Sequence, residues 1–232
     1  MKCIVPLAGP DIYTNEYGLK PNYDIDGEPL LVKAIHSRNW YGKSLFEEDL
    51  IFVIRNFEQL GELQNLLQSN FPQSKQVIIS ESTKGALMSS ISGASIIKDF
   101  SEPIIVDLVD ILFSGDLDPE EIFNQHESIA GILPYFISDN PKYSYLELDE
   151  NSNVLRTREK EVISKYASAG VYFFKNLQTL LQSAIFSMDN FHEVSFNDLL
   201  FLCPSFNEII ENKNTVKAVP VAVSNEISLM FH

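Results

Sequence analysis

The sequence predicts an α/β fold built on a mostly parallel, doubly wound sheet, and three observations support this. Residues 50–54 and 103–109 are apolar runs, the second broken by one aspartate, as is typical of strands buried on both faces. Between them, residues 57–69 carry apolar side chains at positions 57, 60, 63, 66 and 67, which is a helical stripe. Strands and helices that alternate at this spacing favour parallel pairs with right-handed crossovers.

The other elements follow from the same patterns. In the first half we expect further strands at 3–7 and 76–79 and further helices at 29–37 and 85–99. In the second half we expect strands at 129–137, 143–148, 154–157, 169–174 and 216–223, and helices at 177–188 and 196–210. Turn residues between the strands from 129 to 157 indicate antiparallel pairing. Since the chain has no repeat, low-complexity tract or linker, we expect one domain, residues 1–232, whose halves 1–115 and 116–232 face a shared cleft.

Composition narrows the classes of partner. With 17 Lys and Arg against 32 Asp and Glu, the net charge is −15, which disfavours nucleic acid polymers and anionic membranes. A small phosphorylated ligand stays compatible, because one lysine or a divalent cation can reverse the field inside a cleft. No run approaches the ~18 apolar residues that span a bilayer, and the start of the chain lacks the layout of a signal peptide, so a cytoplasmic location is expected. A homo-oligomer is compatible with the sequence.

The sequence lacks the common motifs of zinc sites and of serine hydrolases. The four histidines share no ligand spacing, so the sequence gives no support to zinc chemistry. The two cysteines stand in apolar contexts and are expected to be buried hydrophobic residues. The sequence also lacks the G-x-S-x-G elbow of serine hydrolases.

The N-terminal stretch is the most informative. An apolar run over residues 2–8 ends at Gly9, a polar loop follows, and the chain resumes with Lys20-Pro21 and the turn at 26–29. An apolar run that stops at a glycine near the start of an α/β chain indicates a first strand whose carboxyl end reaches a ligand crevice.

These and later residues resemble the sugar-phosphate nucleotidylyltransferases, segment by segment and in order. The matching segments are IVPLAG at 4–9, Lys20 with DGEPL at 26–30, TKGA at 83–86, PIIVDLVDILF at 103–113, YSY at 143–145, EK at 159–160, IS at 163–164 and AGVYFF at 169–174. The resemblance implies a Rossmann-like mixed sheet flanked by helices. It also implies an Mg²⁺-dependent enzyme that joins a nucleoside triphosphate to a sugar 1-phosphate, or a similar small phosphate, and releases pyrophosphate in the synthesis of cell-surface glycan precursors.

The resemblance assigns roles to particular residues. Lys20 and Asp110 are the expected catalytic residues, and Asp110 and Glu226 are the expected metal ligands, Glu226 standing in for an acid that the family places before a later turn. The nucleotide is expected at Leu7, Ala8, Gly9, Thr83 and Gly85, and the acceptor at Glu159, Lys160 and Gly170.

The residues themselves support some of these roles and leave alternatives for others. Lys20 is the one cation between Lys2 and Lys33, and nucleotidyl transfer needs a cation that holds phosphates and offsets transition-state charge; the alternative is a solvated loop lysine. Asp110 ends a predicted buried strand, where α/β folds bind ligands. Asp107 is expected on the opposite face of that strand, as a turn or helix-cap residue.

Three of the expected site segments have plain structural alternatives. Gly85 would let a base lie against the backbone, or it would simply open a helix capped by Thr83 or Ser82. Glu159 and Lys160 stand in a charge-rich run, so a solvated ion-pair stretch is the competing interpretation. Gly170 would let the backbone approach the sugar, or it would be a bulge glycine within a strand.

The signature loop departs from the family pattern G-x-G-[ST]-R, because Pro10, Asp11 and Tyr13 follow Gly9. Proline removes a backbone donor, and an aspartate beside a triphosphate costs about a few kcal/mol in a partly buried site. Three hypotheses follow: an active nucleotidyltransferase, which could bind a second Mg²⁺ through Asp11; a degenerate module that binds a nucleotide or sugar phosphate without turnover; or a glycosyltransferase of related fold that uses a nucleotide sugar.

Overall fold

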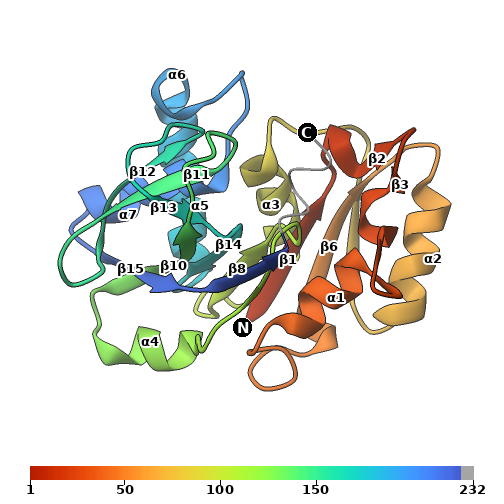
Figure 1. The fold of residues 1–232 in the computed structure, drawn as a ribbon, viewed down its shortest axis with the longest axis horizontal. Helices are drawn as coiled ribbons and strands as arrows, with labels where there is room; N and C mark the ends of the chain where they lie inside the picture. Colours follow the sequence, from red (N-terminus) through yellow and green to blue (C-terminus); the bar gives the residue numbers. More distant parts are fainter. Residues whose placement is uncertain (226–232) are drawn as a thin grey trace.

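A computed structural model describes residues 1–225 and shows one large mixed sheet with helices on both faces (Figure 1). The predicted Glu226 therefore lies outside the described residues. The first half of the chain supplies four parallel strands in the order β7-β6-β1-β8: β1 (Lys2–Leu7), β6 (Leu50–Arg55), β7 (Lys75–Ile79) and β8 (Ile104–Asp107). The predicted parallel core is confirmed.

The second half continues the same sheet with mainly antiparallel strands. They are β14 (Val171–Phe174), which pairs with β8, then β10 (Ile129–Ile137), β13 (Tyr166–Ser168), β11 (Ser144–Leu148) and β12 (Val154–Glu159) at the edge. The strand β15 (Thr215–Pro220) pairs parallel with β10. The polypeptide thus brings the end of β8 and the start of β14 together in the middle of the sheet.

Helices cover both faces because neighbouring residues of the central strands point to opposite sides. On one face Val5 and Phe52 pack with α1 (Leu30–Ser37) and α2 (Leu60–Asn70). On the other face Ile4 and Val53 pack with α3 (Ala86–Ala94), α5 (Leu177–Asp189) and α7 (Leu202–Glu211). Two short helices, α4 (Pro119–Gln125) and α6 (Phe191–Val194), complete the described chain and were not expected from the sequence. None of the helices in residues 1–225 has the length and apolar character needed to cross a membrane.

Several predicted boundaries are wrong for local reasons. The strand expected at 103–109 ends at Asp107, because the Asp107 carboxylate accepts a hydrogen bond from the Val109 amide and Val109 turns to φ 54°. The helix expected at 196–210 begins only at Leu202, since Asn197 and Asp198 take positive φ in a tight turn. The helix expected at 85–99 ends at Ala94.

The last predicted strand, 216–223, is two strands. After β15 the chain turns at Val221, and β16 (Ala222–Asn225) pairs with β9 (Leu112–Ser114), outside the main sheet. The loop after β1 also has more structure than expected, with 3₁₀ turns at Pro10–Ile12 and Lys20–Asn22 and two small ladders, β2 (Tyr13–Thr14) with β3 (Gly18–Leu19) and β4 (Asp24–Ile25) with β5 (Glu28–Pro29).

Candidate active site

A cavity of about 460 Å³ lies where β1 and β8 end, and the predicted site residues within 1–225 all contribute to its wall. They are Leu7, Ala8, Gly9, Lys20, Thr83, Gly85, Asp110, Glu159, Lys160 and Gly170. The position matches the rule that α/β sheets bind ligands at the carboxyl ends of their strands, and the volume suits a small-molecule ligand. Residues from both halves of the chain thus meet around one space.

Lys20 lies at the centre of the charged end of this cavity. Its Nζ donates a hydrogen bond to Asp11 Oδ2 at 2.8 Å and stands 3.9 Å from Asp110 Oδ2. The side chain is only 12% exposed, so water screens these charges weakly. Burial lowers the pKa of Lys20, but Asp110 and Asp11 outweigh it and leave that pKa above its usual value. The alternative of a solvated loop lysine is therefore wrong.

Asp110 stands in the turn that follows β8. Burial raises the pKa of its carboxyl, the nearby Lys20 opposes that rise, and Asp11 and Asp107 add to it. Gly170 lies directly against it, since a Cβ on Gly170 would be 3.2 Å from Asp110 Oδ1. Gly170 also has φ 74°, a backbone conformation that favours glycine. Its conformation and its lack of a side chain both allow the chain to pack closely against Asp110.

Asp107 has a separate, structural role. It accepts hydrogen bonds from Arg38, with Nε to Oδ2 at 2.8 Å and Nη2 to Oδ1 at 3.0 Å, and both side chains are buried. Arg38 Nη2 also donates to the Ile111 carbonyl. The turn prediction for Asp107 is confirmed by its bond to Val109, and the buried ion pair with Arg38 gives this carboxylate a structural partner.

The signature loop is closed on itself. Residues Pro10–Ile12 form a 3₁₀ turn, and the Ile12 amide donates to the Gly9 carbonyl at 3.3 Å. Asp11 folds back toward Gly9, where an added Cβ would meet Asp11 Oδ1 at 2.5 Å. The loop that in the family pattern wraps phosphates here carries a carboxylate bonded to Lys20.

The turn at Thr83–Gly85 is shaped by a neighbouring segment. Gly85 has φ 106°, and a Cβ there would lie 2.2 Å from the Leu200 carbonyl oxygen. The Thr83 hydroxyl donates to the Gly85 carbonyl at 2.8 Å, and neither Thr83 nor Ser82 caps α3, so the capping alternative is wrong. The structure explains the glycine by backbone packing, and Thr83 and Gly85 still face the cavity.

Glu159 and Lys160 form a second charged part of the cavity wall, supplied by the second half of the chain. Glu159 accepts a hydrogen bond from Ser144 Oγ at 2.5 Å, and burial raises the pKa of Glu159 to about 7 against the opposing effects of Ser144 and Lys160. The Lys160 ammonium lies 5.2 Å from the Phe196 ring centroid and 5.3 Å from that of Phe201. The alternative of a solvated ion-pair stretch is wrong for these two residues.

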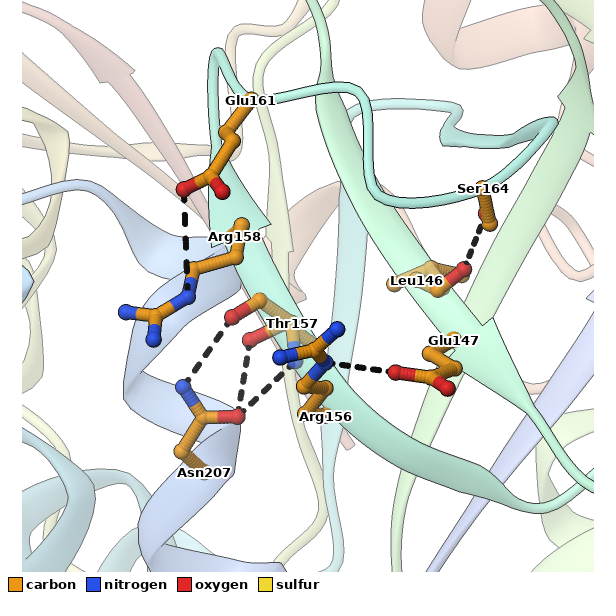
Figure 2. A network of polar contacts seen from close by, with 8 residues as sticks. All are labelled: Leu146, Glu147, Arg156, Thr157, Arg158, Glu161, Ser164 and Asn207. Atoms are coloured by element: carbon orange, nitrogen blue, oxygen red, sulfur yellow. Dashed lines mark hydrogen bonds and ion pairs between the residues drawn. The ribbon is translucent and has the colours of Figure 1, made fainter.

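The interpretation as a solvated ion-pair stretch does hold for the charged residues on either side of Glu159 and Lys160. Arg156 pairs with Glu147 and Arg158 with Glu161 on exposed side chains, as Figure 2 shows. Alternation along β12 points Arg156 and Arg158 toward solvent and Glu159 toward the cavity. Lys160 follows the end of the strand and lines the cavity with its backbone at φ 52°.

The edge strand β12 is fixed to α7 by the side chains of Asn207 and Thr157 (Figure 2). Asn207 Oδ1 accepts a hydrogen bond from the Thr157 amide at 2.9 Å, and Asn207 Nδ2 donates to the Thr157 carbonyl at 3.2 Å. Thr157 Oγ1 donates to the Cys203 carbonyl. An amide side chain thus replaces the neighbouring strand that an edge lacks, two residues before Glu159.

Sequence reasoning missed several residues of the cavity wall. Those with polar or aromatic side chains include Ser89, Lys142, Tyr143, Ser144, Ser168, Tyr172 and Phe201. The YSY motif was available as a signal for Tyr143 and Ser144, because it belongs to the resemblance. Phe201 had no such signal, since it follows a turn that the sequence pattern presents as helix.

A divalent cation fits the charged end of the cavity. Among residues 1–225, no group of three or more His, Cys, Asp or Glu could hold a metal ion by itself. Mg²⁺ is usually held by one or two carboxylates together with water and substrate phosphates. Burial and the two nearby aspartates raise the pKa of the Asp110 carboxyl. A cation that arrives with a nucleotide would stabilise the charged form of this carboxyl.

An α/β sheet whose strand ends open into a cavity lined by lysines and carboxylates is typical of proteins that bind nucleotides. The profile of the family described as "Nucleotidyl transferase" matches residues 43–202, which is more than half of the chain. The chain belongs to this family, and the expected enzyme class, a nucleotidyltransferase, is confirmed. No curated protein matches the sequence.

Solved structures agree on the fold. The nucleoside-diphosphate-sugar pyrophosphorylase from Vibrio cholerae RC9 is 19% identical, with a TM-score of 0.75 over 95% of this chain and 91% of that one. A putative glucose-1-phosphate thymidylyltransferase from Bacillus anthracis is 15% identical, with a TM-score of 0.72 over 96% and 87%. The inositol-1-phosphate CTP transferase from T. maritima is 14% identical, with a TM-score of 0.63 over 94% and 84%. The predicted fold class is confirmed.

Proposed function

We propose that this chain is an Mg²⁺-dependent nucleotidyltransferase that moves a nucleoside monophosphate from an NTP to a sugar 1-phosphate or a similar small phosphate. In this reaction a phosphate oxygen of the acceptor attacks the α-phosphorus, the bond to the β-phosphate breaks, and pyrophosphate leaves. One observation carries the proposal: Lys20 and Asp110 from the first half share a cavity with Glu159 and Lys160 from the second. A role in glycan precursor synthesis stays a prediction.

The residues divide the work by position. Lys20 would hold the phosphates of the NTP and offset the charge that builds up at the α-phosphate. Asp110 would hold Mg²⁺, which supplies charge neutralisation and orientation of the triphosphate when bound. The turn at Thr83 and Gly85 would border the base, and Lys160 would hold the acceptor phosphate while Glu159 accepts hydrogen bonds from acceptor hydroxyls.

The activities named for the structural neighbours support this division. They describe enzymes for sugar 1-phosphates, inositol 1-phosphate and nucleoside-diphosphate sugars. The family match supports nucleotidyl transfer over the nucleotide-sugar-dependent glycosyltransferase that the sequence also allowed.

A second candidate is a module that binds a nucleotide or sugar phosphate without turnover. The observation that favours it is the ion pair of Asp11 with Lys20 at 2.8 Å. The Asp11 carboxylate is bonded to the ammonium that would otherwise bind phosphate. Pyrophosphate release distinguishes the candidates: the protein is incubated with Mg²⁺, each NTP in turn and a panel of sugar 1-phosphates, inositol 1-phosphate and phosphocholine.

Release with at least one pair supports the enzyme. Measurable nucleotide binding without release from any pair contradicts it and leaves the binding module. Binding of nucleoside-diphosphate sugars alone, with no NTP bound, would instead support the glycosyltransferase.

A further inference from the structure

The segment 195–201, which we call the strap, contacts two parts of the cavity wall, the turn before α3 (the nucleotide end) and Lys160 (the acceptor end). It follows α6 and makes a tight turn in which the Phe196 and Leu199 backbones bond to each other, with Asn197 at φ 50° and Asp198 at φ 58°. These left-handed conformations are ones that Asn and Asp adopt more readily than other residues. The turn therefore sets the direction of the aromatic residue on each side of it.

At the nucleotide end the strap is bonded to the turn before α3. The Leu200 amide donates to the Lys84 carbonyl at 2.8 Å, and the Leu87 amide donates to the Leu200 carbonyl at 3.2 Å. Gly85 permits this approach, because any Cβ there would overlap the Leu200 backbone. The strap is thus fixed to the residues that would border the base.

At the acceptor end the strap meets Lys160. The rings of Phe196 and Phe201 stand edge to face, 6.5 Å apart, and the Lys160 ammonium lies within 5.3 Å of both centroids. A cation over an aromatic face is held by the ring quadrupole. The rings carry no net charge, so they fix the position of the ammonium without neutralising it, unlike a carboxylate.

We propose that the strap is a positioning element of the acceptor site, in which Phe196 and Phe201 hold the Lys160 ammonium ready for a phosphate anion. The inference rests on the proposed function for the identity of the anion as the acceptor's phosphate. The contact of Leu200 with the turn at Gly85 ties this position to the nucleotide end.

The test separates the aromatic face from simple packing. Phe201→Leu keeps an apolar side chain and removes the ring, whereas Phe201→Tyr keeps the ring. Phe191→Leu is the matched control, because it removes an aromatic ring on nearby α6 that stands against His192 rather than Lys160. KM for the acceptor, KM for the NTP and kcat are measured with the substrate pair that gives turnover.

We expect Phe201→Leu to raise KM for the acceptor about five- to tenfold, with kcat and KM for the NTP within about twofold. Phe201→Tyr and Phe191→Leu should match the wild type. An unchanged KM for the acceptor in Phe201→Leu overturns the inference. An equal rise of both KM values also overturns it, because the strap would then be a general structural support.

A second measurement does not depend on turnover. After reductive methylation with ¹³C-formaldehyde, the Lys160 signal, assigned with Lys160→Arg, should lie upfield in the NMR spectrum because of the two rings. It should shift on titration with inorganic phosphate, and more weakly in Phe201→Leu. A Lys160 signal at the position of exposed lysines, or one without response to phosphate, overturns the inference. An upfield, phosphate-sensitive signal in a protein that releases no pyrophosphate would instead contradict the proposed function alone.

Discussion

The two ends of the cavity each present a lysine, and they hold it in different ways. Lys20 is bonded to Asp11 and lies close to Asp110, so carboxylates neutralise it. Lys160 rests on two aromatic rings that leave its charge intact. We infer that a phosphate entering the first end must displace Asp11 from Lys20, whereas a phosphate at the second end meets a cation that is already oriented.

The interactions that fix the backbone at Asp110 and at Lys160 also differ in charge. The turn that presents Asp110 is fixed by the buried ion pair of Arg38 and Asp107. The strand that presents Lys160 is fixed by the neutral amide bonds between Asn207 and Thr157. The first support is a buried ion pair and the second is a set of neutral hydrogen bonds, so substitutions in the two supports should affect stability differently.

The largest effect is expected from Asp107→Ala, measured as the free energy of unfolding in urea. Removing one partner leaves the buried Arg38 charge without compensation, which costs about 3–5 kcal/mol. Asp110→Ala is the control three residues away. It should not destabilise the fold, because burial already disfavours the charged form of Asp110. Equal losses in both variants would contradict the separation of a structural from a functional aspartate.

Next in size are the effects on turnover at the charged end. Lys20→Ala and Asp110→Ala should each lower the rate of pyrophosphate release about a hundredfold or more. The first removes the cation that offsets charge at the α-phosphate, and the second removes the carboxylate that would hold Mg²⁺. Lys33→Ala is a matched control, since Lys33 pairs with the exposed Asp26. Near-wild-type turnover in either site variant would show that the site is wrongly assigned even though the family is right.

A smaller effect concerns Glu159 and the pH dependence of stability. Its pKa in the fold is about 7, above its ordinary value of 4.5, so between these values the native state binds a proton that the unfolded state has lost. Stability from this group is therefore present at low pH and is lost as pH rises toward 7 and beyond, by about 1–3 kcal/mol. Glu159→Gln should abolish this loss when unfolding is compared at pH 5 and pH 8. Parallel pH profiles for the two proteins would contradict the raised pKa.

Features with a local cause were accessible from the sequence. The apolar runs of β1 and β6 are buried on both faces, which a continuous run predicts directly. Lys20 and Asp110 were identified because each belongs to a short motif that keeps its place in the chain. The cavity wall confirms that these motifs converge in space.

Features with a distant cause were not accessible. Asp107 bonds to Arg38, 69 residues earlier, and no local pattern indicates that pair. Gly85 is fixed by the backbone of Leu200, and the contact of Lys160 with Phe201 depends on a turn that apolar periodicity presents as helix. In each case tertiary packing, rather than local propensity, decides the structure.

The most direct test of the difference between the two ends is the affinity for pyrophosphate at the charged end, measured by titration calorimetry without divalent cations. Asp11→Asn keeps the shape of the side chain and removes the charge that competes for Lys20. We expect it to lower the Kd for pyrophosphate about five- to tenfold, and Lys20→Ala in the same background should abolish the gain. An unchanged or higher Kd in Asp11→Asn would contradict the displacement of Asp11 by phosphate.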